Sequence, residues 1–396
     1  MKAISIFGRV VNHLISHLYF PNQIRLGAGS LKELGEAVQE LQASHMFIVI
    51  SLSVKKQVGD AVRKIARDAG LKATFFSDYK GEPNTHHVQK ASRILIDSQA
   101  DCVVAIGGGS AIDLAKAVAA AAKNPAVTME SMKTLADVDR FPLIAIPTTA
   151  GTGSEVTKIS VITDEKTRVK INPGHPRLIP DIAILDPALT VSLPKPITAF
   201  TGMDALAHAM EAYVSTLANP ISDVLALEAM SLIGTYLPAV YEKPDDLEAR
   251  EKMLLASSLA GIAFSNASTN LAHAAARPLG ARFHIPHGLS VALVLPYVME
   301  FGLDVNQERY QNVARALDQT GQNQRAEDAV AIVKKLNQVF NLYELGKSFM
   351  HKQELVQAIP QLVRDALSGN GIQTNRKLPN EDDVTEVYAR LIEDLF

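Results

Sequence analysis

Short apolar runs alternate with stretches of helical periodicity along the first half of the chain, and this alternation restricts the possible folds more than any other feature. The predicted strands are residues 46–50, 72–76, 102–106 and 143–146. The helices predicted between them are residues 55–69, 85–99 and 110–122. Strands and helices in alternation indicate a parallel sheet with crossover helices, whose ligands bind beyond the carboxyl ends of the strands.

The pattern changes near Asp186. Beyond it the chain carries long helical periods, for example at residues 330–340 and 384–391, and almost no strand-like alternation. A chain of 396 residues also exceeds the size that one hydrophobic core usually serves. We therefore expect two domains, an α/β domain over residues 1–187 and an all-helical domain over residues 188–396.

Apolar residues recur at helical spacing in the first eighteen positions, namely at Phe7, Val10, Val11, Leu14, Ile15 and Leu18. His13 and His17 interrupt any apolar stretch long enough for a secretory signal. We expect a short amphipathic helix that packs on the protein, in preference to a membrane-surface or partner-binding helix. Elsewhere we find no stretch with the length of a membrane-spanning helix.

Composition excludes several classes of function. The formal net charge of -3 gives no electrostatic reason to bind nucleic acid or an anionic membrane. Cys102 is the single cysteine, so no intrachain disulfide can form, and its apolar neighbours indicate a buried, inert thiol. We expect a cytoplasmic protein without nucleic-acid or membrane partners.

A glycine-rich turn, Gly107, Gly108 and Gly109 followed by Ser110, joins a predicted strand to the next helix. Glycines permit positive φ and a close approach of the backbone to a ligand, and the free N–H groups of a helix start suit a phosphate. The turn is not a GxGxxG pattern, and it lacks the lysine–serine pair of a Walker motif. The spacing of Ser110 and Asp113 also fits a capping box, so part of the pattern is typical of helix initiation alone.

A second loop of small and hydroxyl-bearing residues follows the predicted strand at residues 143–146. Residues 147–157 read PTTAGTGSEVT. Small residues at the carboxyl end of a strand line a ligand without filling its space. Glycine loops after two strands of one sheet favour a dinucleotide over a single phosphate.

Asp204 and His208 lie four residues apart in a helical stretch, so a carboxylate and an imidazole share one helix face. His273 lies in another helical stretch, and His287 lies in a turn-like segment. One carboxylate and three imidazoles suit iron(II) or zinc, with a position left for substrate. Spacing alone does not choose these residues over His175, His284 and Glu211.

Several motifs, in order along the chain, resemble the iron-containing (group III) alcohol dehydrogenase family. They read AIGGGSAIDLAK at residues 105–116, PTTAGTGSEVT at 147–157, GMDALAH at 202–208, AFSN at 263–266 and PHG at 286–288. The resemblance extends from about Tyr19 to Tyr297, and the helical tail matches more loosely. It implies a dehydroquinate synthase-like fold, with an N-terminal dinucleotide-binding domain, a helical C-terminal domain and a metal in the cleft between them.

The resemblance also implies roles for individual residues. The metal ligands fall on Asp204, His208, His273 and His287. The pyrophosphate contacts fall on Gly108, Gly109 and Ser110. Further cofactor contacts fall on Asn84, Thr148, Thr152 and Lys170. Phe264 corresponds to an aromatic residue near the nicotinamide and the substrate, although a core phenylalanine would fit the same position.

The activity that the resemblance implies is the reversible oxidation of an alcohol to an aldehyde or ketone, with hydride transfer to NAD or NADP. A divalent metal, iron(II) or zinc, would bind the substrate oxygen and lower its pKa. The expected partners are a small-molecule alcohol or aldehyde and further copies of the chain, in a homodimer or higher homo-oligomer. A glycerol dehydrogenase-like zinc enzyme and a non-catalytic metal- or nucleotide-binding homologue stay open as alternatives.

Arg277 departs from the family pattern, because many relatives carry a second histidine four residues after the third ligand. An arginine stays protonated and is a poor general base. One hypothesis is that Arg277 faces the cleft and binds a carboxylate-bearing substrate, which its planar guanidinium suits. The alternative is that Arg277 forms an ion pair or reaches solvent while water carries the proton, with His284 as a further candidate for the proton.

Two other segments depart from the family as well. After the strand predicted to end at Ile50, many NAD-preferring relatives place an aspartate, and this chain has Ser51. No arginine stands beside Ser51, although Lys55 and Lys56 follow, so we favour NAD while NADP stays open. Residues 268–277 differ from the glycine- and methionine-containing stretch of relatives, which leaves the substrate unnamed.

Overall fold

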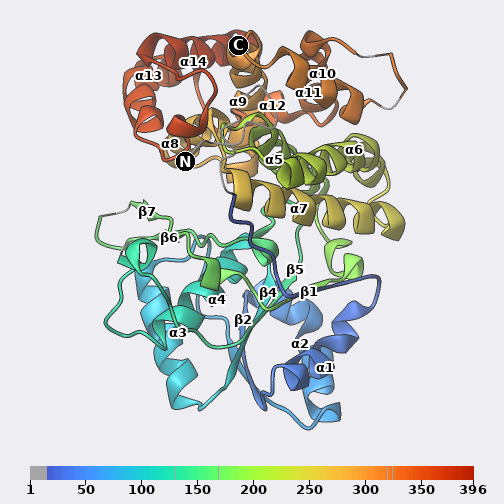
Figure 1. Cartoon of the computed structure of the whole chain (residues 1–396), viewed down its shortest axis with the longest axis vertical. Helices are drawn as coiled ribbons and strands as arrows, with labels where there is room; N and C mark the ends of the chain where they lie inside the picture. Colours follow the sequence, from blue (N-terminus) through green and yellow to red (C-terminus); the bar gives the residue numbers. More distant parts are fainter. Residues whose placement is uncertain (1–15, 130, 168, 319, 323) are drawn as a thin grey trace, which may run out of the picture.

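The computed structural model describes residues 16–129, 131–167, 169–318, 320–322 and 324–396. Its first half contains a 6-stranded parallel sheet in the order β1-β8-β5-β4-β2-β3 (Figure 1). The strands are β1 Gln23–Leu26, β2 His45–Ile50, β3 Lys72–Phe76, β4 Cys102–Gly107, β5 Leu143–Pro147 and β8 Ile182–Leu185. The four strands expected from the sequence are confirmed, whereas β1 and β8 are additional to them.

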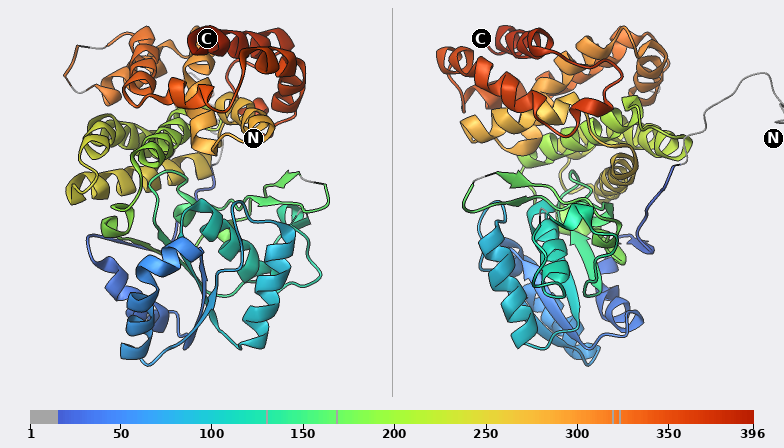
Figure 2. Two further views of the ribbon diagram at one scale, coloured as in Figure 1. Left: turned by 180° about the vertical axis from the view of Figure 1, so that it is seen from behind. Right: turned by 60° about the vertical axis from the view of Figure 1, so that its left-hand side comes forward.

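Helices cover both faces of this sheet. They are α1 Leu34–Glu40 and α2 Leu52–Asp68 on one face, and α3 Thr85–Asp97 and α4 Gly109–Ala121 on the other (Figure 2). Side chains alternate between the faces along each strand. Thus Phe47 and Val103 pack in the cluster that contains α3 and α4, while Ile48 and Val104 pack in the cluster that contains α1 and α2.

The order of the strands reverses between β2 and β4, which are neighbours in the sheet. In parallel sheets of this kind, ligands bind at the carboxyl ends of the strands that flank such a reversal. β4 ends in Gly107, at the glycine turn, and β2 ends just before Ser51. The topology therefore assigns the ligand-binding edge to the loops that the sequence singled out.

The second half is helical and has its own large apolar core. Its helices are α5 Lys195–Val214, α6 Pro220–Glu242, α7 Leu247–Ala267, α8 Leu271–Phe283, α9 His287–Gly302, α10 Gln307–Leu317, α11 Ala326–Val339, α12 Leu342–Lys347, α13 Lys352–Leu367 and α14 Glu381–Leu395. Figure 1 shows this half stacked on the carboxyl-end side of the sheet. The α/β and all-helical classes are confirmed, and we propose the domain boundary near residue 187, between β8 and α5.

Loop residues after β5 dock directly on α7. Gly153 has φ 60, and a Cβ atom there would lie 2.6 Å from the Cα atom of Gly261 in α7. The Ser258 hydroxyl of α7 donates a hydrogen bond of 2.6 Å to the buried carboxylate of Glu155. Only glycine permits so close an approach of two backbones. This contact and the hydrogen bond of Glu155 hold the second glycine loop against the helical half.

Among the described residues, α6 is long and apolar enough to cross a membrane by length and composition. The expectation that no stretch reaches this length was therefore wrong. One such helix is weak support for a membrane span, because core helices pass the same test. α6 packs against α5, α7 and α10. The helix expected in the first eighteen residues lies almost wholly outside the described residues, and Leu18 is in no helix.

Candidate metal centre and nucleotide cleft

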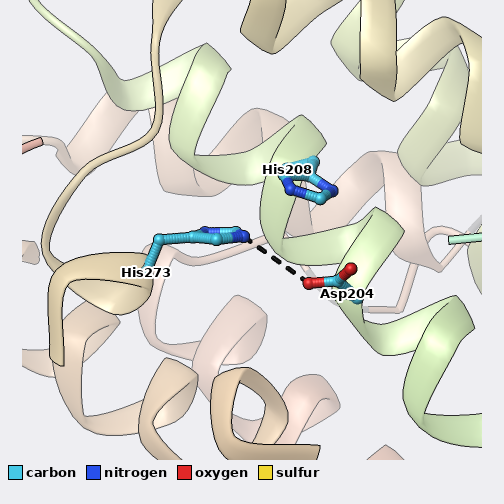
Figure 3. A group of neighbouring side chains, drawn as sticks. All are labelled: Asp204, His208 and His273. Carbon is cyan, nitrogen blue, oxygen red and sulfur yellow. Dashed lines mark ion pairs between the residues drawn. The ribbon is translucent and has the colours of Figure 1, made fainter. Parts of the chain in front are cut away.

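Three helices supply the side chains of the predicted metal centre. Asp204 and His208 lie one turn apart in the middle of α5, and His273 is in the first turn of α8. His287, predicted in a turn, is the first residue of α9. Figure 3 shows the side chains of Asp204, His208 and His273 pointing toward one another. These three are buried, and His287 is half-buried.

The donor atoms of these residues converge. The Nε2 atom of His273 lies 3.5 Å from Oδ1 of Asp204, and Nε2 of His287 lies 3.8 Å from the same oxygen. One donor atom each from Asp204, His208 and His273 lies within 4.8 Å of the others. The rings of His208 and His273 are stacked with centroids 4.4 Å apart. The structure thus brings together all four residues on which the resemblance placed the ligands.

The donor set fits a divalent metal. Oδ1 of Asp204, Nδ1 of His208 and Nε2 of His273 are buried without a hydrogen-bond partner. Unsatisfied buried polar atoms are costly and need an explanation such as an ion. Ligands about 2.1 Å from a tetrahedral metal lie about 3.4 Å apart, close to the separations found here.

Most of these donor groups are in the unprotonated form that a metal requires. Burial by itself would raise the pKa of Asp204, but the neighbouring His208, His273 and His287 hold it well below its usual range. Burial lowers the pKa of His208 to about 4. Burial likewise lowers the pKa of His287 to about 3. At neutral pH the carboxylate is therefore charged and these two imidazoles are neutral, as metal ligands must be.

His273 behaves differently because it faces two carboxylates. Burial lowers its pKa, but the charges of Glu211 and Asp204 outweigh burial and raise it to about 9. Nδ1 of His273 is hydrogen-bonded to Oε2 of Glu211. Oε1 of Glu211 accepts the backbone N–H of Ala272 at 2.7 Å and that of His273 at 3.3 Å. Glu211 therefore fixes both the ring and the start of α8.

Spacing in the sequence offers Glu211 only as a possible ligand and does not reveal this orienting role. A signal is nevertheless present, since Glu211 follows Asp204 by seven residues and His208 by three, which places all of them on one face of α5. His175 and His284 lie outside the described cluster. His175 accepts the N–H of Arg177 with its Nδ1. His284 is exposed and ends α8 with φ 56.

A cavity of about 470 Å³ joins the metal centre to the glycine loops. Its lining includes all four predicted ligands and the predicted cofactor residues Gly109, Ser110, Thr152 and Lys170. Lys170 also forms a salt bridge of 2.6 Å with Glu82. Residues of the two halves thus line one open cleft, as a cofactor and substrate site requires.

The remaining predicted cofactor residues, Gly108, Thr148 and Asn84, are not part of the cavity lining. Gly108 is the N-cap of α4, and the N–H of Thr148 donates to the carbonyl of Gly107 at 3.0 Å, which links the two glycine loops. Asn84 caps α3 through a 2.9 Å hydrogen bond from the N–H of His87. Its neighbour Pro83 does line the cavity.

The start of α4 is free of side-chain caps. A Cβ atom at Gly109 would lie 2.8 Å from Cγ2 of Thr152, so the two glycine loops touch here. The capping box that the spacing of Ser110 and Asp113 also allowed is absent. The carboxylate of Asp113 accepts instead from the hydroxyl of Ser154 at 2.5 Å and from the N–H of Val161 at 3.0 Å. The N–H groups of Ala111 and Ile112 donate to the carbonyl of Gly108, which leaves those of Gly109 and Ser110 for an anion.

Lys116, which the sequence did not single out, holds the loop beside the cavity. It is fully buried, and its Nζ donates to the carbonyls of Thr157 and Ile159 at 2.7 Å each. Burial lowers its pKa to about 8. Thr157 and Ile159 both line the cavity, so Lys116 positions one of its walls.

Phe264 and Arg277 also line the cavity. The ring of Phe264 stacks on that of His208, with centroids 4.2 Å apart and an interplanar angle of 15°. Arg277 lies one turn after His273 on α8 and is half-buried. Among the described residues, Arg277 has no hydrogen bond or ion pair, so the ion pair considered for it does not form within them.

Comparison with known proteins places the chain among relatives over nearly its whole length. Residues 21–187 match the iron-containing alcohol dehydrogenase family, and residues 198–392 match the C-terminal part of the Fe-containing alcohol dehydrogenase family. The probable alcohol dehydrogenase EutG of Escherichia coli is 43% identical over 370 residues, which cover 92% of this chain and 91% of that protein.

Two further proteins agree. The NADPH-dependent butanol dehydrogenase of Clostridium saccharobutylicum is 35% identical over 377 residues, 93% of this chain and 96% of that protein. A crystal structure of 1,3-propanediol oxidoreductase has a TM-score of 0.89 at 31% identity, and the match covers 96% of this chain and 100% of that one. The chain therefore belongs to the iron-containing alcohol dehydrogenase family and is an alcohol dehydrogenase.

Proposed function

We propose that this enzyme is metal-dependent, that Asp204, His208, His273 and His287 are its metal ligands, and that it uses NAD(P). The observation that carries the proposal is the convergence of unpartnered donor atoms on a cavity that the glycine loops also line. A divalent metal there lowers the pKa of a substrate hydroxyl and polarises a carbonyl, and NAD(P) exchanges the hydride.

The residues of the chain hold and orient these groups. Asp204 supplies the negative charge of the metal site, and His208 and His287 supply neutral imidazoles at neutral pH. Glu211 keeps the ring of His273 turned so that Nε2 faces Asp204. The ring of Phe264 covers His208 and keeps water from that side.

The nucleotide is expected along the glycine loops. The uncapped start of α4, with Gly108, Gly109 and Ser110, suits the pyrophosphate. Thr148, Thr152, Asn84 and Lys170 are proposed as further contacts. Ser51 caps α2 and has no arginine beside it, so we favour NAD over NADP. Arg277 stays protonated, and for this reason it is not proposed as the base.

Iron(II) is the proposed metal and zinc is the alternative, because one carboxylate and three imidazoles suit both. The expected substrate is a small alcohol or aldehyde, and the expected assembly is a homodimer or higher homo-oligomer. The cytoplasm is the proposed location, because a chain with one cysteine forms no intrachain disulfide. Burial raises the pKa of the Cys102 thiol and keeps it unreactive.

The test is a turnover assay on protein of known metal content. Chelator-treated enzyme, reloaded with iron(II) or with zinc, is mixed with NAD or NADP and a panel of alcohols and aldehydes, and the absorbance of NAD(P)H is followed. We expect turnover only in reloaded samples, and its loss in Asp204→Asn, with the exposed Asp60→Asn as control. Full activity in metal-free enzyme would refute the metal role, and no turnover in any sample would favour a non-catalytic homologue.

A further inference from the structure

Arg277 is a cation in the cavity that the protein itself does not neutralise. Its side chain lines the cavity beside the proposed metal ligands. Within the described residues it makes no hydrogen bond and no salt bridge. Burial lowers its pKa, which the nearby charge of Glu211 only partly opposes. A cation in such a position calls for an anionic partner.

Other buried or half-buried arginines have hydrogen-bond partners in the protein. Arg140 forms paired hydrogen bonds to the carboxylate of Asp181, at 2.7 and 2.9 Å. Arg309 does the same with Asp223, at 2.9 and 2.8 Å. Arg250 donates to the carbonyl of Pro244 and to the hydroxyl of Thr198, although its Nη2 atom has no hydrogen-bond partner. All three arginines thus have hydrogen-bond partners in the protein and two of them pair with a carboxylate, whereas Arg277 has neither among the described residues.

The carboxylates that line the cavity are engaged elsewhere. Glu82 is paired with Lys170, and Asp113 accepts from the hydroxyl of Ser154 and the N–H of Val161. Asp204 faces the histidines of the metal centre. None of these acids is paired with Arg277, so the partner of its guanidinium is expected to be a ligand in the cavity.

We propose that Arg277 binds the carboxylate of a short-chain substrate, so that the enzyme prefers hydroxy acids, and the aldehyde acids they yield, over neutral alcohols. The proposal rests on the proposed function and specifies its substrate class. A planar guanidinium binds a carboxylate through two parallel hydrogen bonds. The substrate carbinol loses a hydride to NAD(P)+ and a proton to solvent, and its carboxylate is unchanged.

Arg277 lies close enough to the proposed metal centre to contact a small substrate bound there. It follows His273 by four residues on α8, about 6 Å along the helix axis, and it lines the same cavity as the four proposed ligands. An alcohol carbon near the metal ligands and a carboxylate at Arg277 can therefore belong to one small molecule. Because the arginine side chain is long and flexible, hydroxy acids of two to four carbons are the substrates to test.

The first test compares matched substrates. Glycolate, 3-hydroxypropanoate and 4-hydroxybutanoate are each paired with the neutral alcohol of equal carbon number, and the ratio of kcat/KM for acid over alcohol is measured. We expect at least one pair to favour the acid about tenfold or more in the wild type. Arg277→Met, which removes the charge and keeps the length, should reduce this ratio about 100-fold. Arg277→Lys keeps the charge but loses the planar fork, and should reduce it about tenfold.

Arg282→Met is the matched control, because Arg282 is an exposed arginine on the same helix. Its acid-to-alcohol ratio should equal that of the wild type. A ratio near one for every pair in the wild type, or an equal ratio in wild type and Arg277→Met, would overturn the proposal. Turnover of the neutral alcohols in that case would leave the proposed function standing.

The second test measures binding without turnover. Butanoate, an unreactive carboxylate, is titrated calorimetrically into wild type and Arg277→Met, each with and without metal. We expect binding that weakens about 100-fold in Arg277→Met and that persists in metal-depleted wild type. Binding that Arg277→Met leaves intact and metal removal abolishes would assign the carboxylate to the metal and refute the proposal. A large loss of nucleotide affinity in Arg277→Met would assign Arg277 to the cofactor and would refute the proposal as well.

Failure of the proposed function gives a different pattern. If neither acids nor neutral alcohols change the NAD(P)H absorbance, the proposed function is wrong. The butanoate titration still decides whether Arg277 holds a carboxylate, because it depends on no reaction.

Discussion

Glu211 accepts a hydrogen bond from Nδ1 of His273, so a carboxylate outside the proposed ligand set fixes the orientation of a proposed ligand. Partners of this kind set the tautomer of a ligating histidine, and their removal weakens metal affinity about 10- to 100-fold. We predict this loss for Glu211→Gln, measured by competition with a chelator of known affinity. Glu228→Gln, an exposed change on α6, is the control and should leave affinity unchanged. Equal affinity in all three proteins would show that Glu211 is only structural.

The pH dependence of metal binding follows from His273. Its pKa of about 9 means that below this pH a metal must displace a proton from the imidazole. His208 and His287, with pKa values of about 4 and 3, are already neutral at neutral pH and add nothing there. Affinity should therefore rise about tenfold per pH unit from pH 6.5 to 8.5 and level off near pH 9. Metal dissociation constants measured across this range check it, and a flat profile would contradict it.

The sequence predicts the strands that read as uninterrupted apolar runs of five or six residues, and also the edge strand β3, which is rich in phenylalanine. β2, β4 and β5 lie inside a parallel sheet with helices on both faces, so they read as apolar runs. β1, with the sequence QIRL, is a mostly exposed edge strand that pairs only with β8, and it carries no such run. β8 is apolar but only four residues long, and it is hard to distinguish next to the change of pattern at Asp186.

Some of the proposed metal ligands could likewise be predicted from the sequence and others could not. The spacing of Asp204 and His208 is a local property of one helix, and it is visible in the sequence. His273 and His287 come from other helices, and their approach to Asp204 is set by how α5, α8 and α9 pack. No local pattern contains that packing, so only the resemblance selected them. Asp113 is the opposite case. Its spacing from Ser110 fits a capping box, but its carboxylate is hydrogen-bonded to Ser154 and Val161 of another loop instead.

The close contact of Gly153 with α7 can be tested by substitution. Gly153→Ala adds a Cβ atom 2.6 Å from the Cα of Gly261 and close to other backbone atoms of α7, which cannot move aside as a side chain can. We expect a loss of about 3 kcal/mol in the free energy of unfolding, from overpacking together with the positive φ. Gly70→Ala is the control, since Gly70 has φ 70 but nothing within 4 Å, and it should cost about 1 kcal/mol. Chemical denaturation measures both, and equal losses would mean that the contact with α7 is not tight.

The backbone conformation of Ser268 predicts that glycine at this position stabilises the protein against unfolding. It lies at the end of α7 with φ 74 and ψ 164, a conformation that is essentially restricted to glycine. Ser268→Gly should raise the free energy of unfolding by about 1 kcal/mol, although the hydrogen bond from its hydroxyl to the carbonyl of Thr269 is lost. Ser268→Ala loses the same hydrogen bond and keeps the strain, so it should be no more stable than the wild type. If both variants are destabilised alike, the backbone at this position carries no strain.

The position of Ser51 after β2 suggests a substitution that would change the preference between NAD and NADP. It directly follows β2, beside the point where the strand order reverses, and its Oγ accepts the N–H of Val54 at 3.4 Å as the N-cap of α2. An aspartate caps a helix equally well, so Ser51→Asp should fold normally. Its charge would hydrogen-bond an adenosine ribose and repel a 2′-phosphate. We expect kcat/KM with NAD, divided by kcat/KM with NADP, to be about tenfold or more higher in Ser51→Asp than in the wild type. Ala61→Asp places the same charge on an exposed residue of α2 ten positions later and should leave the ratio nearly unchanged. An equal response of both variants would mean that the adenosine ribose does not lie at the end of β2.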